Sequence, residues 1–251
     1  MKWSDLERER ARLGRPFVIA HRGAPKEEPE NTLASFARAL KQGADVLETD
    51  LRFSRDGEIV LFHDATLERM TDGAGTVSEQ SLARLKRLET RRPNGTLTAE
   101  RIPTLVELLA MTGAQTPLLL ELKDERFIEE RYARRFIDTL AGYGMLDRAA
   151  VISFQPALVH AVRQLYPPLI AGYVTLSNPR PPRDAQLAGP FWPLLLLNPL
   201  YVRTVHRRGS IIAPLDPNPL PRLALYRALG VDALLADEPG PVVRALTSTN
   251  G

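Results

Sequence analysis

The sequence predicts an α/β fold, a (β/α)8 barrel of the TIM type with a small insertion after the second strand. Nine short apolar runs are typical of strands, and most are followed by a segment with helical periodicity. One of these strands returns through a tight turn and is expected to pair antiparallel, which leaves eight βα units, the number that closes a barrel. A chain of 251 residues suits one such domain. An open, doubly wound sheet is the alternative.

The predicted strands are runs of four to eight mostly apolar residues with turn signals between them. Arg55-Asp56-Gly57 is a hairpin signal, so the run after it is expected to return along the second strand. The predicted strands cover residues 17–20, 46–53, 59–62, 118–122, 151–152, 170–174, 194–197, 211–213 and 233–236.

The predicted helices follow from apolar periodicity and from residues that commonly begin or end helices. Ser4 and Glu7 have capping-box spacing, and Asn31 is a candidate cap for the second helix. Gly14, Gly43 and Gly230 are predicted to end helices. The predicted helices cover residues 4–13, 31–40, 81–88, 104–111, 125–140, 157–165, 202–206, 221–229 and 242–246.

The βα rhythm breaks between about residues 54 and 103, where Thr, Gly, Arg and Glu are frequent. We interpret this stretch as an insertion in a single domain spanning residues 1–251. The proline-rich stretch from Asn178 to Pro193 is predicted to be a loop that can reshape the substrate pocket.

The composition is that of an ordinary globular protein, with 44% apolar and 25% charged residues. Its net charge of +3, from interspersed charges, gives no nucleic-acid signature. The lack of cysteine excludes disulfides, thiolate metal sites and cysteine nucleophiles. A charged amino-terminal segment and the absence of a long apolar run argue against a signal peptide or a transmembrane helix, so we expect a cytoplasmic protein.

A pair of carboxylates on the second strand is the first candidate for chemistry. Glu48 and Asp50 are two residues apart and therefore share a face, while Leu47 and Leu51 take the other. Two carboxylates on a buried strand repel each other unless a positive charge lies between them. A divalent cation is the simplest way to supply that charge.

Further polar residues stand at the ends of other predicted strands. Glu121 after three leucines adds a third carboxylate, and such a donor set without cysteine suits Mg²⁺ or Ca²⁺. His21 and His63 suit a general acid and a general base, and Arg22 and Lys123 suit an anionic oxygen. Together these residues predict phosphodiester chemistry.

Other polar residues have simpler interpretations. His160 and His206 fall in predicted helices and are expected to be structural. Ser153 and Asp237 are expected to be hydrogen bonders of loops or caps rather than catalytic groups.

The ordered set of these segments resembles the glycerophosphodiester phosphodiesterases. The resemblance covers nearly the whole chain and is densest over residues 17–123. The matching segments are His21-Arg22-Gly23, Pro29-Glu30-Asn31-Thr32, residues 43–50, Asp56-Gly57, His63-Asp64, residues 67–75, residues 102–105 and Glu121-Leu122-Lys123.

This resemblance implies one divalent metal held by Glu48, Asp50 and Glu121, and an acid/base pair of His21 and His63. It implies that Arg22 and Lys123 bind phosphate. The expected substrate is a small-molecule glycerophosphodiester, cleaved to sn-glycerol 3-phosphate and an alcohol. A lysophospholipase D-like activity and a non-catalytic headgroup-binding protein are the alternatives.

The segment from Ile211 to Asp216 lacks the tryptophan that the family usually carries on its seventh strand. The sequence therefore does not define the pocket for the alcohol group. The head group, the choice between Mg²⁺ and Ca²⁺, the role of each histidine, the nucleophile (water or the glycerol 2-hydroxyl) and the oligomeric state also remain open.

Overall fold

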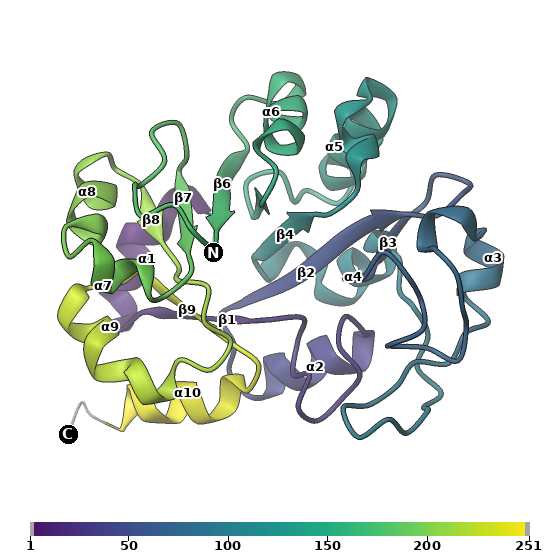
Figure 1. Ribbon diagram of the computed structural model, residues 1–251, viewed down its shortest axis with the longest axis horizontal. Helices are drawn as coiled ribbons and strands as arrows, with labels where there is room; N and C mark the ends of the chain where they lie inside the picture. The colour runs from purple at the N-terminus through teal and green to yellow at the C-terminus, as the bar shows by residue number, and fades with distance from the viewer. Residues whose placement is uncertain (1–2, 249–251) are drawn as a thin grey trace.

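Over residues 3–248, which the computed structural model describes, eight parallel strands form a nearly closed ring with helices outside it (Figure 1). The predicted (β/α)8 barrel is therefore confirmed. A ninth strand, β3 (Ile59–Leu61), pairs antiparallel with β2, as the hairpin signal predicted. The parallel strands are β1 (Phe17–Ala20), β2 (Val46–Phe53), β4 (Leu118–Leu122), β5 (Ala149–Ser153), β6 (Ile170–Thr175), β7 (Leu187–Pro190), β8 (Ile211–Ile212) and β9 (Ala233–Ala236).

The strands follow the order β8-β7-β6-β5-β4-β2-β1-β9, and Asp232 connects the two ends of that order. The Asp232 backbone N–H donates to the Ile212 carbonyl at 3.1 Å, and the Asp232 carboxylate accepts from the Ile212 N–H at 2.8 Å. The same buried carboxylate pairs with Arg10 and His206. The backbone and the side chain of this one residue thus join β8 to the segment before β9, although these two strands do not pair with each other.

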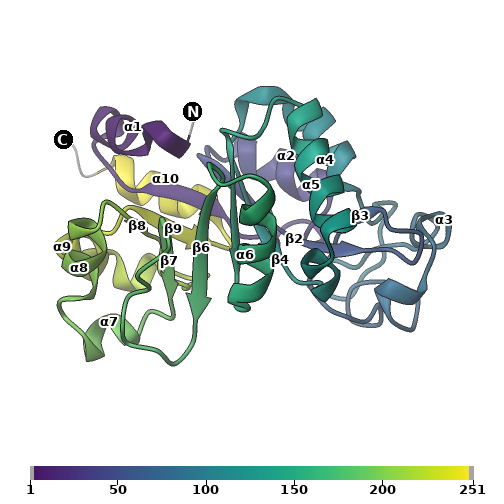
Figure 2. The same cartoon turned by 90° about the horizontal axis from the view of Figure 1, so that it is seen from above.

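The helices cover the outside of the barrel, and α1 and α7 lie at its opposite ends (Figure 2). The helices are α1 (Leu6–Leu13), α2 (Leu33–Lys41), α3 (Leu82–Leu85), α4 (Leu105–Thr112), α5 (Glu130–Gly142), α6 (Pro156–Leu165), α7 (Leu194–Leu197), α8 (Tyr201–Arg207), α9 (Leu223–Leu229) and α10 (Pro239–Thr247). Short 3₁₀ turns are η1 (Trp3–Asp5), η2 (Val77–Glu79), η3 (Gly113–Gln115), η4 (Glu125–Ile128) and η5 (Leu220–Arg222).

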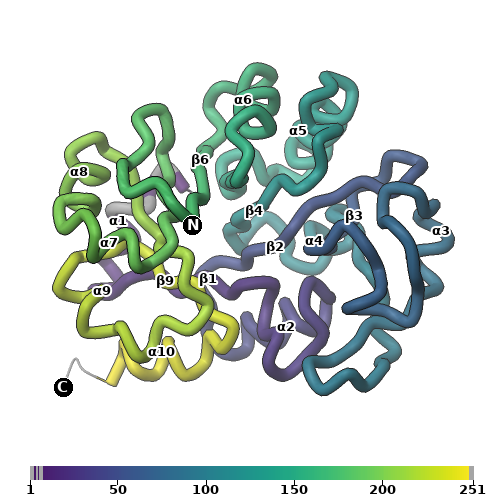
Figure 3. Tube along the Cα trace, viewed as in Figure 1, coloured from purple at the N-terminus to yellow at the C-terminus, as the bar shows by residue number. Residues whose placement is uncertain are grey.

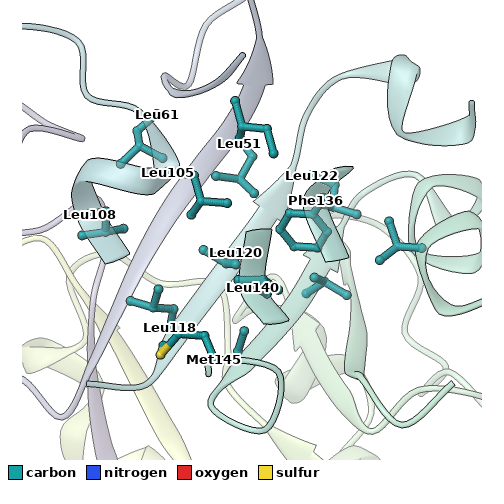
Figure 4. Packing of buried hydrophobic residues seen from close by; sticks show 14 of the residues in the cluster. Leu51, Leu61, Leu105, Leu108, Leu118, Leu120, Leu122, Phe136, Leu140 and Met145 are labelled. Carbon is teal, nitrogen blue, oxygen red and sulfur yellow. The ribbon is translucent and has the colours of Figure 1, made fainter. Parts of the chain in front are cut away.

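Strand alternation separates two layers of core on β4. Leu118, Leu120 and Leu122 face outward and pack with residues of α4 and α5 (Figure 4). Leu119 and Glu121 point into the barrel, where Leu119 packs in the apolar floor that also contains Trp3. The apolar floor supports the polar mouth above it.

The stretch between β2 and α4 leaves the barrel on the side marked by α3 and then returns to it (Figure 3). It has its own small cluster of buried residues: Val60, Phe62, Leu67, Val77, Leu85, Leu88 and Ile102. Among residues 3–248, no helix combines the length and the apolar character needed to cross a membrane.

One predicted strand was wrong. Residues 194–197 form the helix α7, and the sixth parallel strand is β7, which lies inside the stretch predicted to be loop. Four leucines in a row do not distinguish a strand from a helix, and the Leu-Ala-Gly-Pro sequence of β7 gives a poor strand signal.

Two helix starts also differ from the prediction. Thr32, not Asn31, caps α2, because its hydroxyl accepts from the Ser35 N–H. Asp5 precedes α1, and the side chains of Ser4 and Glu7 lie outside the described residues. The predicted helix over 125–140 is interrupted at Glu129, between η4 and α5.

Candidate active site

The register of β1, β2 and β4 brings the predicted carboxylates together at the carboxyl end of the barrel. Asp50 pairs with Glu121 across β2 and β4, and Glu48 precedes Asp50 on the same face. One carboxylate oxygen of each residue lies within 4.8 Å of the others, and all three side chains are buried. The site therefore begins as three carboxylates in one small volume.

The donor set fits a hard divalent cation. Asp50 Oδ1 and Glu121 Oε1 are buried and accept no hydrogen bond of good geometry. Oxygen atoms of this kind are the ligands that Mg²⁺ and Ca²⁺ prefer. Glu48, Asp50 and Glu121 are thus the residues that could hold a metal in this mouth.

Two cations lie against the carboxylates. Lys123 Nζ is 2.6 Å from Glu121 Oε1 and 3.3 Å from Asp50 Oδ1. Arg22 Nε is 3.2 Å from Asp50 Oδ2, and the Arg22 backbone N–H donates to Glu48 Oε2 at 2.9 Å. Both predicted phosphate-binding residues therefore border the candidate metal site.

These two cations do not neutralise all three carboxylates. Burial and the charges of Asp50 and Glu121 raise the pKa of Glu48 well above its ordinary value. Burial and Asp50 also raise the pKa of Glu121 to about 7, although Lys123 opposes the rise. Burial alone would raise the pKa of Asp50, but Arg22 and Lys123 outweigh it and lower that pKa to about 2. An additional positive charge would stabilise the ionised forms of Glu48 and Glu121.

The two predicted acid/base residues each have a carboxylate partner. His21 Nδ1 is 2.7 Å from Asp237 Oδ1, and His63 Nδ1 is 2.7 Å from Asp64 Oδ1. When Nδ1 carries the proton that bonds the carboxylate, Nε2 is the atom that can exchange a proton with substrate. The sequence places both histidines at strand ends, and the structure brings both to the same mouth as the carboxylates.

The surroundings of His63 favour its neutral form. Burial lowers the pKa of His63, and the positive charges of Arg22 and Lys123 lower it further, against the opposing charge of Asp50. Arg52 holds the backbone in place by donating from Nε and Nη2 to the His63 carbonyl at 3.0 and 2.8 Å.

The turn after β1 adopts a backbone conformation that few residues accept. Arg22 and Asn31 have φ of 57° and 58°, a region that is uncommon for side chains other than glycine. Gly23 has φ of 91°, and a Cβ there would lie 2.7 Å from the backbone carbon of Ser35. Gly23 is therefore needed for the turn that places His21 and Arg22.

Asn31, which belongs to a segment that resembles the family and was also a candidate helix cap, lies in the site and does not cap α2. Its Nδ2 donates to Asp50 Oδ2 at 2.9 Å, and its Oδ1 accepts from the Thr49 hydroxyl at 2.7 Å. Asn31 thus fixes the orientation of the Asp50 carboxylate.

The sequence interpretation missed two positioning residues. Asp237 was expected to serve a loop or cap, yet it bonds His21; the pairing of Ala20 with Ala236 makes these two residues neighbours. Arg69 donates to Glu30 at 2.7 and 3.0 Å and to Asp64 at 2.5 Å, so it links both sides of the mouth. Arg69 lies in the segment 67–75 that resembles the family, but the sequence gave no role for it.

The remaining polar candidates behave as expected. The Ser153 hydroxyl donates to the Leu122 carbonyl and accepts from the Gln155 N–H, a local structural role. His160 bonds Asp184 and Tyr173, and His206 pairs with Asp232.

Asp216, at the end of the segment that lacks the tryptophan, accepts from Arg222 at 2.6 and 2.7 Å and from the Tyr226 hydroxyl at 2.6 Å. Trp192, which follows β7, lies close to this segment. The guanidinium carbon of Arg222, the partner of Asp216, stands 4.4 Å from the centroid of the Trp192 ring.

Comparison with known proteins gives a consistent result. The model of the Glycerophosphoryl diester phosphodiesterase family matches residues 21–241. A glycerophosphodiester phosphodiesterase of Caldanaerobacter subterraneus subsp. tengcongensis is 29% identical over 235 residues, covering 90% of this chain and 96% of its own length. One from Bacillus altitudinis is 27% identical over 237 residues, with 90% and 96% covered. The structure of an Oleispira antarctica phosphodiesterase in complex with the product sn-glycerol-3-phosphate superimposes with a TM-score of 0.80 at 28% identity, over 94% of this chain and 98% of that one.

Proposed function

This chain belongs to the glycerophosphoryl diester phosphodiesterase family of phosphoric diester hydrolases, and from this premise we propose that it cleaves glycerophosphodiesters to sn-glycerol 3-phosphate and an alcohol with the help of one divalent metal ion. The observation that carries the proposal is the convergence of Glu48, Asp50 and Glu121 at the end of the barrel where the two carboxylate-paired histidines also lie. The product bound by the Oleispira antarctica relative supports the choice of product.

Glu48, Asp50 and Glu121 would hold the metal. Bound there, Mg²⁺ or Ca²⁺ would act as a Lewis acid and stabilise the negative charge that grows on the phosphoryl oxygens. The raised pKa values of Glu48 and Glu121 support this assignment, since Arg22 and Lys123 together leave three buried carboxylates short of positive charge.

Arg22 and Lys123 would bind the phosphate. Each offers a charged donor beside the carboxylates, and each is mostly buried, with 16% and 14% of its side chain exposed. A buried cation stabilises an anionic oxygen more strongly than an exposed one, because water screens it less. Arg22 is also fixed in place by Glu30, at 3.1 Å from its Nη1.

The two histidines would move the protons. We assign His63 as the general base, because its surroundings keep it neutral and able to accept a proton at Nε2 from the attacking oxygen. His21 would then donate a proton to the alkoxide as the phosphorus–oxygen bond breaks. Asp237, at 2.7 Å from Nδ1, orients the His21 ring so that Nε2 is the atom that can carry the proton to the alkoxide.

The test is the release of sn-glycerol 3-phosphate from glycerophosphocholine and glycerophosphoethanolamine, measured with Mg²⁺, with Ca²⁺ and with EDTA. Metal-dependent release by the native chain, and its loss in His63→Ala by ~10² to 10⁴-fold, are expected. Release of choline phosphate instead would show cleavage of the other ester bond and refute the proposed product. A lysophosphatidylcholine arm tests the lysophospholipase D-like alternative.

A further inference from the structure

Six exposed apolar side chains gather at the carboxyl end of three consecutive strands, β5, β6 and β7. We call them the apolar rim: Phe154, Leu176, Phe191, Leu196, Leu197 and Leu200. Leu197 is 73% exposed and Leu200 is 60% exposed. Single exposed leucines are common on protein surfaces, whereas a group around one opening indicates an interaction site.

The apolar rim is joined to the candidate active site. The Phe154 ring lies 5.5 Å from Lys123 Nζ, so the rim starts beside a proposed phosphate-binding residue. Phe154 also lines a cavity of about 290 Å³ together with Asn178 and Arg180 of the next loop. That loop contacts the segment after α7, because Asn198 Nδ2 donates to the Pro179 carbonyl at 2.8 Å. The three loops therefore form a connected border of the mouth.

Exposed arginines stand near the rim, and the exposed carboxylate of Asp184, which lines the same cavity, is paired with His160. Arg180 and Arg203 are exposed, and Arg203 stands three residues after Leu200, one turn along α8. The sequence from Ala185 to Leu215 contains no Asp or Glu. Leucines bordered by arginines are suited to a surface with an apolar interior and anionic head groups.

We propose that the apolar rim docks on an anionic lipid bilayer, so that the mouth of the barrel faces the membrane surface. α7 lies at the end of the barrel opposite α1 (Figure 2), so it can reach a flat surface on that side. Leu196, Leu197 and Leu200 would enter the boundary between head groups and acyl chains, and Arg180 and Arg203 would contact the lipid phosphates. The positive charge favours this occupant over an apolar face of a second copy of the chain, whose arginines would meet their own counterparts. This inference goes beyond the proposed function and does not depend on catalysis.

The test is co-sedimentation with vesicles of phosphatidylglycerol and, in parallel, of phosphatidylcholine, at low and high salt. We expect binding to phosphatidylglycerol that weakens as salt rises, because salt screens the arginines. Leu196→Ser/Leu197→Ser should weaken partitioning at least about tenfold through the lost apolar burial. Arg180→Gln and Arg203→Gln should each weaken it about fivefold, and on phosphatidylglycerol alone.

Met111→Ser/Tyr143→Ser is the matched control, since these side chains are 36% and 37% exposed and precede η3 and β5 on the far side of the barrel. It should bind like the native chain, and all variants should show native unfolding midpoints. No binding to phosphatidylglycerol, or an equal loss in the control, overturns the proposal. Concentration-dependent dimers that only Leu196→Ser/Leu197→Ser abolishes, without vesicle binding, would assign the rim to self-association instead.

Discussion

Asp237→Asn tests whether the pairing of His21 matters for turnover. The carboxylate lies 2.7 Å from His21 Nδ1, and 25% and 15% of the two side chains are exposed. Asparagine keeps the size of the side chain and removes its charge. It also allows an N–H to face the ring, which favours the wrong tautomer of His21.

The magnitude follows from the contact that is lost. A hydrogen bond to a charged group contributes about 1.5–3 kcal/mol, and 1.36 kcal/mol corresponds to a tenfold change in rate. We therefore expect kcat/KM to fall by roughly 10- to 100-fold, mainly through kcat, because the imidazolium of His21 is needed only as the leaving alkoxide forms.

The assay is steady-state release of sn-glycerol 3-phosphate at saturating metal, from pH 5 to pH 9. The rate should be lowered across this whole pH range, because Asp237→Asn disturbs the orientation of the His21 ring. Glu238→Gln is the control, since this neighbour is exposed. A loss under threefold in Asp237→Asn, or an equal loss in Glu238→Gln, would refute the role assigned to Asp237.

Three further predictions concern the metal, the pH dependence and the turn after β1. Mg²⁺ or Ca²⁺ at about 100 times its Kd should raise the free energy of unfolding in urea by about 2.7 kcal/mol, and Glu48→Gln should remove this increase; an increase that persists in the variant would place the metal elsewhere. At saturating metal, the acid limb of kcat/KM should lie below pH 6.5, because His63 protonates as the pH falls through a pKa that burial lowers from 6.5; a limb that His63→Ala leaves unchanged would contradict this assignment. Gly23→Ala should lower the free energy of unfolding in urea by at least about 2 kcal/mol, since φ is 91° and Ser35 blocks the new Cβ. Gly95→Ala is the control, because Gly95 also has a positive φ but has open space around the new Cβ, and it should cost about 1 kcal/mol. Equal losses in the two variants would show that the clash with Ser35 contributes nothing.

The sequence predicts a strand well where its apolar pattern has the period of a strand and turn residues mark both of its ends. β1, β2 and β4 have uninterrupted apolar or alternating patterns and clear turn signals, and their predicted bounds match the structure. The region around β7 fails for a physical reason. A strand containing glycine and proline is stabilised by its neighbours in the barrel rather than by its own propensity. In α7, Leu194 and Leu195 are buried while Leu196 and Leu197 are exposed, a division that a run of four identical residues does not reveal.

Some residues of the candidate site can likewise be predicted from the sequence, whereas others are found only in the folded structure. Glu48 and Asp50 can be predicted from the sequence because their spacing alone puts them on one face of the strand. Glu121 can be predicted because it ends an apolar strand. Asp237 is 216 positions from its partner His21, so only the register of β1 and β9 reveals the pair. Asn31 has the residue type of a cap, and only the folded structure shows that its side chain donates to Asp50 instead.

The central claim is that Glu48, Asp50 and Glu121 hold one divalent metal on which hydrolysis depends. The most direct measurement titrates metal-free protein with Mg²⁺ or Ca²⁺ by calorimetry and follows sn-glycerol 3-phosphate release in the same samples. We predict one binding event per chain, activity that rises with its occupancy, and loss of both in Asp50→Asn. Full activity in metal-free protein, or unchanged binding in Asp50→Asn, would contradict the assignment of this metal site.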